Sequence, residues 1–201
     1  IVAQADRIKG AAGDNLRRVL ETAALLQQRG VAFQLVLAGQ GRDRRSLERT
    51  AAEMGLKNII FTGHIGDREL LDGLYMAASL FVFPSLYDTA GLVVREAAVM
   101  GTPSVVVRGT APAEVICDGL NGFLGEDNAE SLGGVIARYL QELTPKQRLA
   151  IRRQAQKTVP LPWEKVMGEV EERYRELIRR GRRKRSILPG LPNLPELHLP
   201  R

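Results

Sequence analysis

Short runs of apolar residues alternate along most of the chain with longer stretches in which apolar residues recur every three to four positions. The short runs have the pattern of strands that are buried on both faces, as in a parallel sheet covered by helices. We therefore expect strands at residues 1–3, 33–38, 59–61, 80–83 and 104–107.

The longer stretches predict amphipathic helices between those strands. In the first of them, apolar residues from Leu16 to Leu26 form one face of a helix that ends at Gly30. Further helices are expected around 46–54, 69–77, 91–100 and 131–140. Alternation of strands and helices at this spacing predicts a Rossmann-like, three-layer α/β/α domain with a mostly parallel sheet.

The chain divides into three predicted parts. Residues 1–160 form the Rossmann-like domain, and prolines then break the chain before a helix from about Trp163 to Arg179. We expect residues 161–180 to be a C-terminal helix that packs on this domain or on a preceding one, and 181–201 to be a basic, proline-rich tail. Because the chain opens on a buried strand with no turn or cap before it, we expect it to be cut from a longer protein.

The net charge of +6 is concentrated in one short cluster, Arg179–Arg185. Such a cluster attracts anionic lipid headgroups or nucleic acid, although a solvated chain end also explains it. Few aromatic residues are available to stack on bases, so no nucleic acid is expected. With no membrane-spanning apolar run and no signal-peptide pattern, we predict a cytoplasmic protein, peripheral to the inner face of the membrane.

Histidines and cysteines are too few for common metal or disulfide chemistry. The chain has one cysteine, Cys117, and two histidines. An intramolecular disulfide and a multi-cysteine or histidine-rich metal site are therefore excluded, and we expect neither a metal nor a bound cofactor. Cys117 is interpreted as a small buried residue.

Two loops follow predicted strands at the edge where open α/β sheets bind ligands. The first contains Gly39 and Gly41, but Arg44 stands where a dinucleotide fingerprint has its third glycine. The second runs from Pro84 and carries Asp88, Gly91 and Glu96, with a helix beginning near Gly91.

Free N–H groups at the start of that helix favour a phosphate, and Gly91 would allow a ligand close to the backbone. Asp88 and Glu96 would then flank a pyrophosphate and accept hydrogen bonds from sugar hydroxyls. The residues equally allow Asp88 to be an ordinary helix cap and Glu96 a surface residue.

Several segments resemble the retaining glycosyltransferases of the GT-B fold, the glycosyl transferases group 1 family. They are LVLAGQGRD, KNIIFTGHI, ASLFVFPSLYDTAGLVVREAAVMGTPSVVV and APAEVICDGLNGFL, followed by PWEKVMGEVEERYREL, which is similar to the family's terminal helix. The resemblance implies the C-terminal, donor-binding half of the GT-B fold, with the acceptor bound by a preceding N-terminal domain.

The family pattern has two acids separated by seven residues, and Asp88 and Glu96 occupy those places. The resemblance implies that Glu96 binds the ribose and that Asp88, where the usual residue is Glu, holds a hydroxyl of the donor sugar. It also implies that the backbone amides of Gly91 and Leu92 donate to the pyrophosphate or to the sugar.

The same resemblance places the nucleotide base against the backbone around His64 and Ile65, and the loop of Gly39 and Gly41 in the donor site. The early part matches less well, because Gln4 stands where the family has an Arg. Lys9 falls where the family has a Lys on the donor phosphates, so Asp88 and Lys9 are the expected catalytic residues.

Together these features imply retaining transfer of a sugar from a nucleotide-diphosphate sugar to an acceptor, in glycolipid or cell-surface polysaccharide synthesis. UDP is expected as the nucleotide because it is the commonest in such enzymes. Without the acceptor-binding domain, this chain is expected to bind donor weakly and to transfer no sugar. The alternatives are a nucleotide-sugar epimerase and a non-catalytic nucleotide-sugar-binding protein.

Overall fold

The structure, a computed structural model, describes the backbone of residues 1–4 and 11–185 and the side chains of residues 1–3 and 15–180. It divides into two compact units, Ile1–Pro160 and Leu161–Arg201. Lys9 lies outside the described residues.

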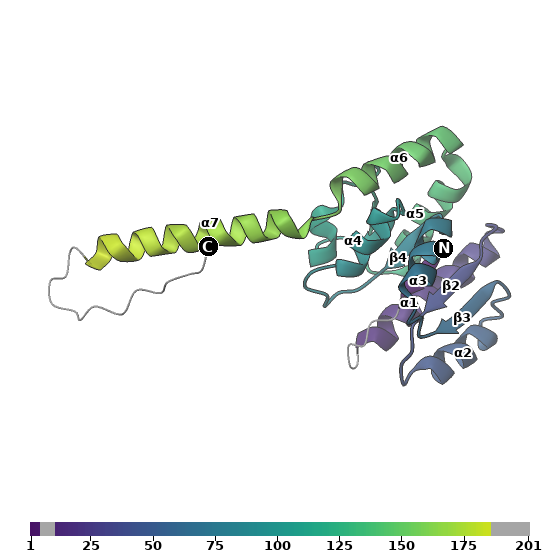
Figure 1. The fold of residues 1–201 in the computed structure, drawn as a ribbon. Coiled ribbons are helices and arrows are strands. Elements are labelled where there is room, and N and C mark those ends of the chain that lie inside the picture. The colour runs from purple at the N-terminus through teal and green to yellow at the C-terminus, as the bar shows by residue number, and fades with distance from the viewer. Residues whose placement is uncertain (5–10, 186–201) are drawn as a thin grey trace. The chain divides into compact units, whose positions relative to one another are not determined.

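The first unit is built on a six-stranded sheet with the strand order β3-β2-β1-β4-β5-β6 (Figure 1). All the neighbouring strands pair in parallel. The strands are β1 (Val2–Gln4), β2 (Leu35–Ala38), β3 (Ile59–Gly63), β4 (Phe81–Phe83), β5 (Ser104–Val107) and β6 (Phe123–Gly125). The strand order reverses at β1, which lies between β2 and β4, and such a reversal opens a crevice at the carboxyl ends of the strands.

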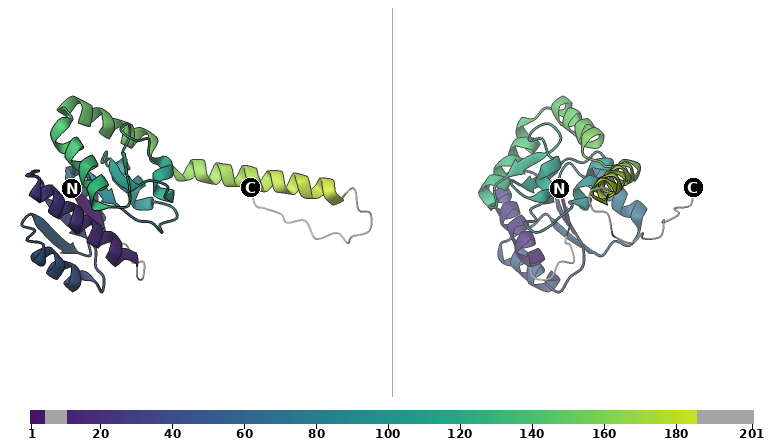
Figure 2. Two further views of the ribbon diagram at one scale, coloured as in Figure 1. Left: turned by 180° about the vertical axis from the view of Figure 1, so that it is seen from behind. Right: turned by 90° about the vertical axis from the view of Figure 1, so that its left-hand side faces the viewer.

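Helices cover both faces of this sheet (Figure 2). The helices of the first unit are α1 (Ala11–Gln28), α2 (Arg44–Glu53), α3 (Arg68–Ala77), α4 (Leu92–Val99), the 3₁₀ helix η1 (Ala111–Val115), α5 (Ala129–Ala137), the π-helix η2 (Arg138–Glu142) and α6 (Pro145–Thr158). Buried residues of α1, α2 and α5 form one apolar cluster with the sheet, and those of α3 and α4 form a second. The predicted Rossmann-like α/β/α fold is therefore confirmed.

The second unit contains one helix, α7 (Trp163–Arg185), in the part that the structure describes. One of its faces carries a stripe of exposed apolar side chains, from Val170 at 38% to Trp163 at 73% exposure. The others in this stripe are Met167, Tyr174, Leu177 and Ile178. Among the described residues, no helix is both long and apolar enough to cross a bilayer.

The extent of α7 corrects the predicted boundary between a helix and a tail at residue 180. The helix runs to Arg185, so the whole cluster Arg179–Arg185 is helical. Arg and Lys are good helix formers, and positive charge near a helix C-terminus is favoured by the helix dipole. Cys117 is likewise exposed rather than buried.

Candidate functional site

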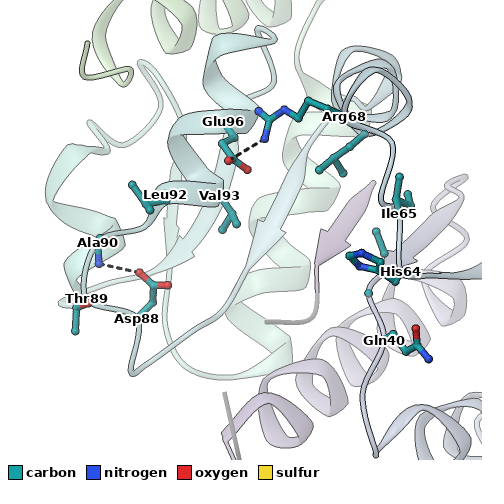
Figure 3. A pocket seen from close by; sticks show the side chains of 13 residues that line it. Gln40, His64, Ile65, Arg68, Asp88, Thr89, Ala90, Leu92, Val93 and Glu96 are labelled. Carbon is teal, nitrogen blue, oxygen red and sulfur yellow. Dashed lines mark hydrogen bonds and ion pairs between the residues drawn. The ribbon is translucent and has the colours of Figure 1, made fainter. Parts of the chain in front are cut away.

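An open cleft of about 580 Å³ lies at the carboxyl edge of the sheet (Figure 3). The loops after β2, β3 and β4 and the first turns of α3 and α4 form its walls. The lining residues are Ala38, Gly39, Gln40, His64, Ile65, Arg68, Leu71, Asp88, Thr89, Ala90, Leu92, Val93 and Glu96. Ligands of open α/β sheets bind at this edge.

Most of the residues singled out from the sequence meet in this cleft. Of the predicted set, the cleft lining includes Gly39, His64, Ile65, Asp88, Leu92 and Glu96. Figure 3 shows Asp88 and Glu96 on the side formed by α4 and the loop before it, with His64, Ile65 and Gln40 on the other. Gly41 and Gly91 are described but are not part of the lining.

Asp88 shapes the turn that leads into α4. Its Oδ1 accepts a hydrogen bond from the N–H of Ala90 at 2.9 Å and another from the N–H of Gly91. These bonds form a turn before the helix. Asp88 is therefore not the ordinary helix cap that the residues alone allowed, because the N-cap of α4 is Gly91 and no side chain caps that helix. The bonds use Oδ1, so Oδ2 is left for a ligand in the cleft.

The structure corrects the role expected for Gly91. Its φ of +58° lies in the left-handed region, and a Cβ atom there would lie 3.2 Å from Cα of Pro112 in η1. The glycine is therefore required by the turn and by the close packing of η1. Its N–H is occupied by Asp88, so it is not available to a phosphate.

The free amides of α4 are those of the next two residues. Among the described residues, the N–H groups of Leu92 and Val93 have no hydrogen-bond partner, whereas those of Val94 and Arg95 donate to the carbonyl oxygen of Gly91. Both Leu92 and Val93 line the cleft. The N-terminus of α4 thus presents two backbone donors, which favour an anion.

Sequence reasoning missed Arg68, which lies at the start of α3. Its Nη1 is 3.0 Å from Oε1 of Glu96, and its Nε is 3.0 Å from Oδ1 of Asp72. The hydrogen bond to Glu96 is the main cause that raises the pKa of Arg68 above its ordinary value. No local sequence pattern predicts this contact, because 28 residues separate Arg68 from Glu96.

The sheet and the helices on its two faces define the chain as a Rossmann-like α/β domain with a cleft at the carboxyl edge of the sheet. The family model for glycosyl transferases group 1 matches residues 10–158. The chain belongs to the glycosyl transferases group 1 family, and this confirms the predicted family.

One relative is the GDP-mannose-dependent α-(1-6)-phosphatidylinositol dimannoside mannosyltransferase of Mycobacterium tuberculosis. The chain is 32% identical to it over 139 residues, which are 69% of this chain and 35% of that protein. The chain thus spans about a third of the length of this relative.

Solved structures show the same fold. The C-terminal domain of the glycosyl transferase group 1 family protein LpcC from Francisella tularensis matches with a TM-score of 0.67 at 24% identity, over 79% of this chain and 83% of that one. HepE from Anabaena, solved in complex with UDP and glucose, matches with a TM-score of 0.63 at 21% identity, over 79% of this chain and 44% of that one. Both likenesses show the Rossmann-like α/β fold, and the LpcC match is to a C-terminal domain.

Proposed function

We propose that this chain is the donor-binding domain of a retaining glycosyltransferase and holds a nucleotide-diphosphate sugar in the cleft. The observation that carries the proposal is the placement of two carboxylates, Asp88 and Glu96, in one cleft with the free amides of Leu92 and Val93 between them in sequence. In this proposal Glu96 binds the ribose, the two amides bind the diphosphate, and Oδ2 of Asp88 accepts from a hydroxyl of the sugar.

The base of the nucleotide is proposed to pack against the loop of His64 and Ile65, on the opposite side of the cleft. Both residues line the cleft beside Gln40, and the His64 side chain is exposed. UDP is the nucleotide expected in the donor, because it is the commonest in such enzymes, and HepE was solved in complex with UDP. The relative of higher identity uses GDP-mannose, which makes GDP-mannose the first donor to compare with UDP-sugars.

We further propose that the acceptor is bound by a preceding domain of similar fold, because the match covers only 35% of the mannosyltransferase. The exposed stripe of α7 would pack on one of the two domains, since apolar side chains such as Trp163 and Leu177 gain stability when they leave water. The chain alone is then expected to bind donor and to transfer no sugar. Glycolipid or cell-envelope polysaccharide synthesis is the proposed role.

An anionic membrane surface is the proposed partner of the cluster Arg179–Arg185. The cluster carries six positive charges, and 6 − 6 leaves a net charge of 0 for the rest of the chain. A nucleic acid running along α7 would meet the five Glu residues between 163 and 178, which outnumber three basic ones there. A membrane can touch the basic end alone.

The test is a calorimetric titration of the 201-residue chain with UDP, GDP, UDP-glucose and GDP-mannose. We expect one nucleotide to bind selectively and its binding to be lost in Glu96→Ala. The matched control is Glu53→Ala, because Glu53 is an exposed acid on α2 that does not line the cleft. No binding of any nucleotide, or equal binding by Glu96→Ala, would contradict the proposal. Conversion of the bound sugar to its epimer, followed by NMR, would instead support the epimerase alternative.

A further inference from the structure

We infer that Arg68 is a positioning residue that orients the Glu96 carboxylate toward the ribose hydroxyls of the donor. The preference of the cleft for ribonucleotides over deoxynucleotides should therefore depend on Arg68 as well as on Glu96. The inference rests on the proposed function, in which Glu96 binds the ribose.

The guanidinium of Arg68 joins two carboxylates from different helices. Asp72 lies one turn further along α3 and is 3.0 Å from Nε, whereas Glu96 comes from α4 and is 3.0 Å from Nη1. Because the guanidinium group is planar and its nitrogens have a fixed geometry, the ion pair with Asp72 restricts where Nη1 can lie. Arg68 is thus paired with an acid of its own helix and also contacts Glu96. Figure 3 shows the contact between Arg68 and Glu96.

This arrangement leaves one oxygen of Glu96 for a ligand. Arg68 contacts Oε1, and among the described residues no hydrogen bond to Oε2 is found. The Glu96 side chain is 33% exposed and lines the cleft, so a ligand can reach it. A carboxylate that is already fixed loses less conformational entropy when it accepts a hydroxyl hydrogen bond.

A direct contact between Arg68 and the diphosphate is the less favoured role. Arg68 is the one Arg or Lys among the residues that line the described cleft. Its charge is already matched by Glu96 and Asp72, and the free amides of α4 belong to Leu92 and Val93. Arg68 therefore acts through Glu96, whose orientation it sets.

The experiment measures Kd for the preferred nucleoside diphosphate and for its 2′-deoxy and 3′-deoxy forms, by calorimetry with the 201-residue chain. We expect the unaltered chain to bind at least one deoxy form about tenfold more weakly, the loss of one hydrogen bond to a charged group. In Arg68→Gln this ratio should fall close to one, and Arg68→Lys should give an intermediate ratio because it keeps the charge but not the planar fork. Arg42→Gln is the control, since Arg42 is exposed and outside the cleft lining.

A double-mutant cycle with Glu96→Gln tests whether the two residues act together. We expect Arg68→Gln to have no further effect on the ratio once Glu96 is replaced. An unchanged ratio in Arg68→Gln, while Glu96→Gln weakens binding, would overturn the inference and leave the proposed function standing. A loss in Arg68→Gln that grows from nucleoside to diphosphate would overturn it in favour of a phosphate contact. If Glu96→Gln binds every nucleotide normally, or the unaltered chain binds none, the proposed function fails and the inference fails with it.

Discussion

The carboxylate of Asp88 accepts a hydrogen bond from the backbone N–H of Gly91, three residues further along the chain. The turn closed by this bond sets where α4 begins, and so sets the direction in which the amides of Leu92 and Val93 point. A residue predicted to touch the sugar therefore also builds the helix end that is proposed to touch the diphosphate.

The two roles of Asp88 can be separated by comparing Asp88→Asn with Asp88→Ala. Asparagine keeps an oxygen that can accept the hydrogen bonds of the turn, so the free energy of unfolding should change little, whereas the alanine variant should lose about 1 kcal/mol. Both variants remove the carboxylate, and both should lose the extra affinity of the nucleotide sugar over the free nucleotide. Urea denaturation gives the free energy of unfolding and calorimetry gives the affinities. An alanine variant of unaltered stability would contradict the role of Asp88 in the turn.

Gly91→Ala should destabilise the first unit by about 2 kcal/mol, from a left-handed φ combined with a Cβ contact 3.2 Å from Cα of Pro112. Gly134→Ala is a suitable control, since Gly134 lies inside α5 and a Cβ there meets nothing within 4 Å. That change should raise the free energy of unfolding by about 0.5–1 kcal/mol through helix propensity. Equal effects of the two substitutions in urea denaturation would show that the turn does not require glycine.

The basic end of α7 should bind vesicles that contain anionic phosphatidylglycerol and should not bind pure phosphatidylcholine vesicles. Replacing Arg182, Arg183 and Lys184 by Gln should reduce partitioning on the order of 100-fold, at about 1 kcal/mol per basic residue. Co-sedimentation at low salt measures this, and added salt should weaken the binding.

The matched control for that experiment replaces Arg42, Arg45 and Arg49, which are exposed residues at and before α2, by Gln. It removes the same charge from another surface and should leave vesicle binding nearly intact. Equal losses in both triple variants would mean that net charge alone drives the binding. Tighter binding to a random DNA duplex than to anionic vesicles at equal phosphate concentration would favour a nucleic-acid partner.

Alkaline pH should destabilise the first unit through Tyr139, which is 1% exposed. Burial, the main cause, raises the pKa of its hydroxyl above the ordinary value of 10.0. As pH rises through about 10, the unfolded chain releases this proton while the folded chain keeps it. The free energy of unfolding therefore falls as pH rises from the ordinary pKa to the raised pKa of the folded chain.

Urea denaturation between about pH 9 and about pH 11 should show this slope in the unaltered chain. The slope should be smaller in Tyr139→Phe and unchanged in Tyr87→Phe, because Tyr87 is 68% exposed. A Tyr139→Phe variant that keeps the full alkaline slope would show that other groups cause it.

The sequence predicted five of the six strands, because each contains a short apolar run. Burial on both faces explains that run in β4 and β5, whereas β3 lies at the edge of the sheet and leaves Ile60 exposed. Strand β6 (Phe123–Gly125) was missed, since only two of its three residues are apolar and the third is a glycine. Helix α6 was also missed, because in Pro145–Thr158 only Ile151 and Ala155 are buried. Its capping box of Thr144 and Gln147 was a local signal that could have revealed it.

The parts of the cleft that were predicted are those that a single loop contributes. Asp88 and Glu96 lie on one short segment, and the strand-to-helix change between them marks an edge of the sheet. The partner of Glu96 comes from another helix, and nothing near Arg68 in sequence indicates which acid it meets. The sequence assigned Gly91 to ligand binding. Its packing against Pro112 could not be predicted, because that contact depends on the tertiary fold.

The central place of β1 has a consequence for how the chain folds. Val2 pairs with Val36 on one side and with Phe81 on the other, so the second contact closes a loop of 81 − 2 = 79 residues. Until β4 is available, β1 exposes an unpaired edge, the kind of edge on which strands of other chains assemble. Because such long-range pairing is slow, joining the two halves of the sheet should limit the folding rate and be the step most exposed to aggregation.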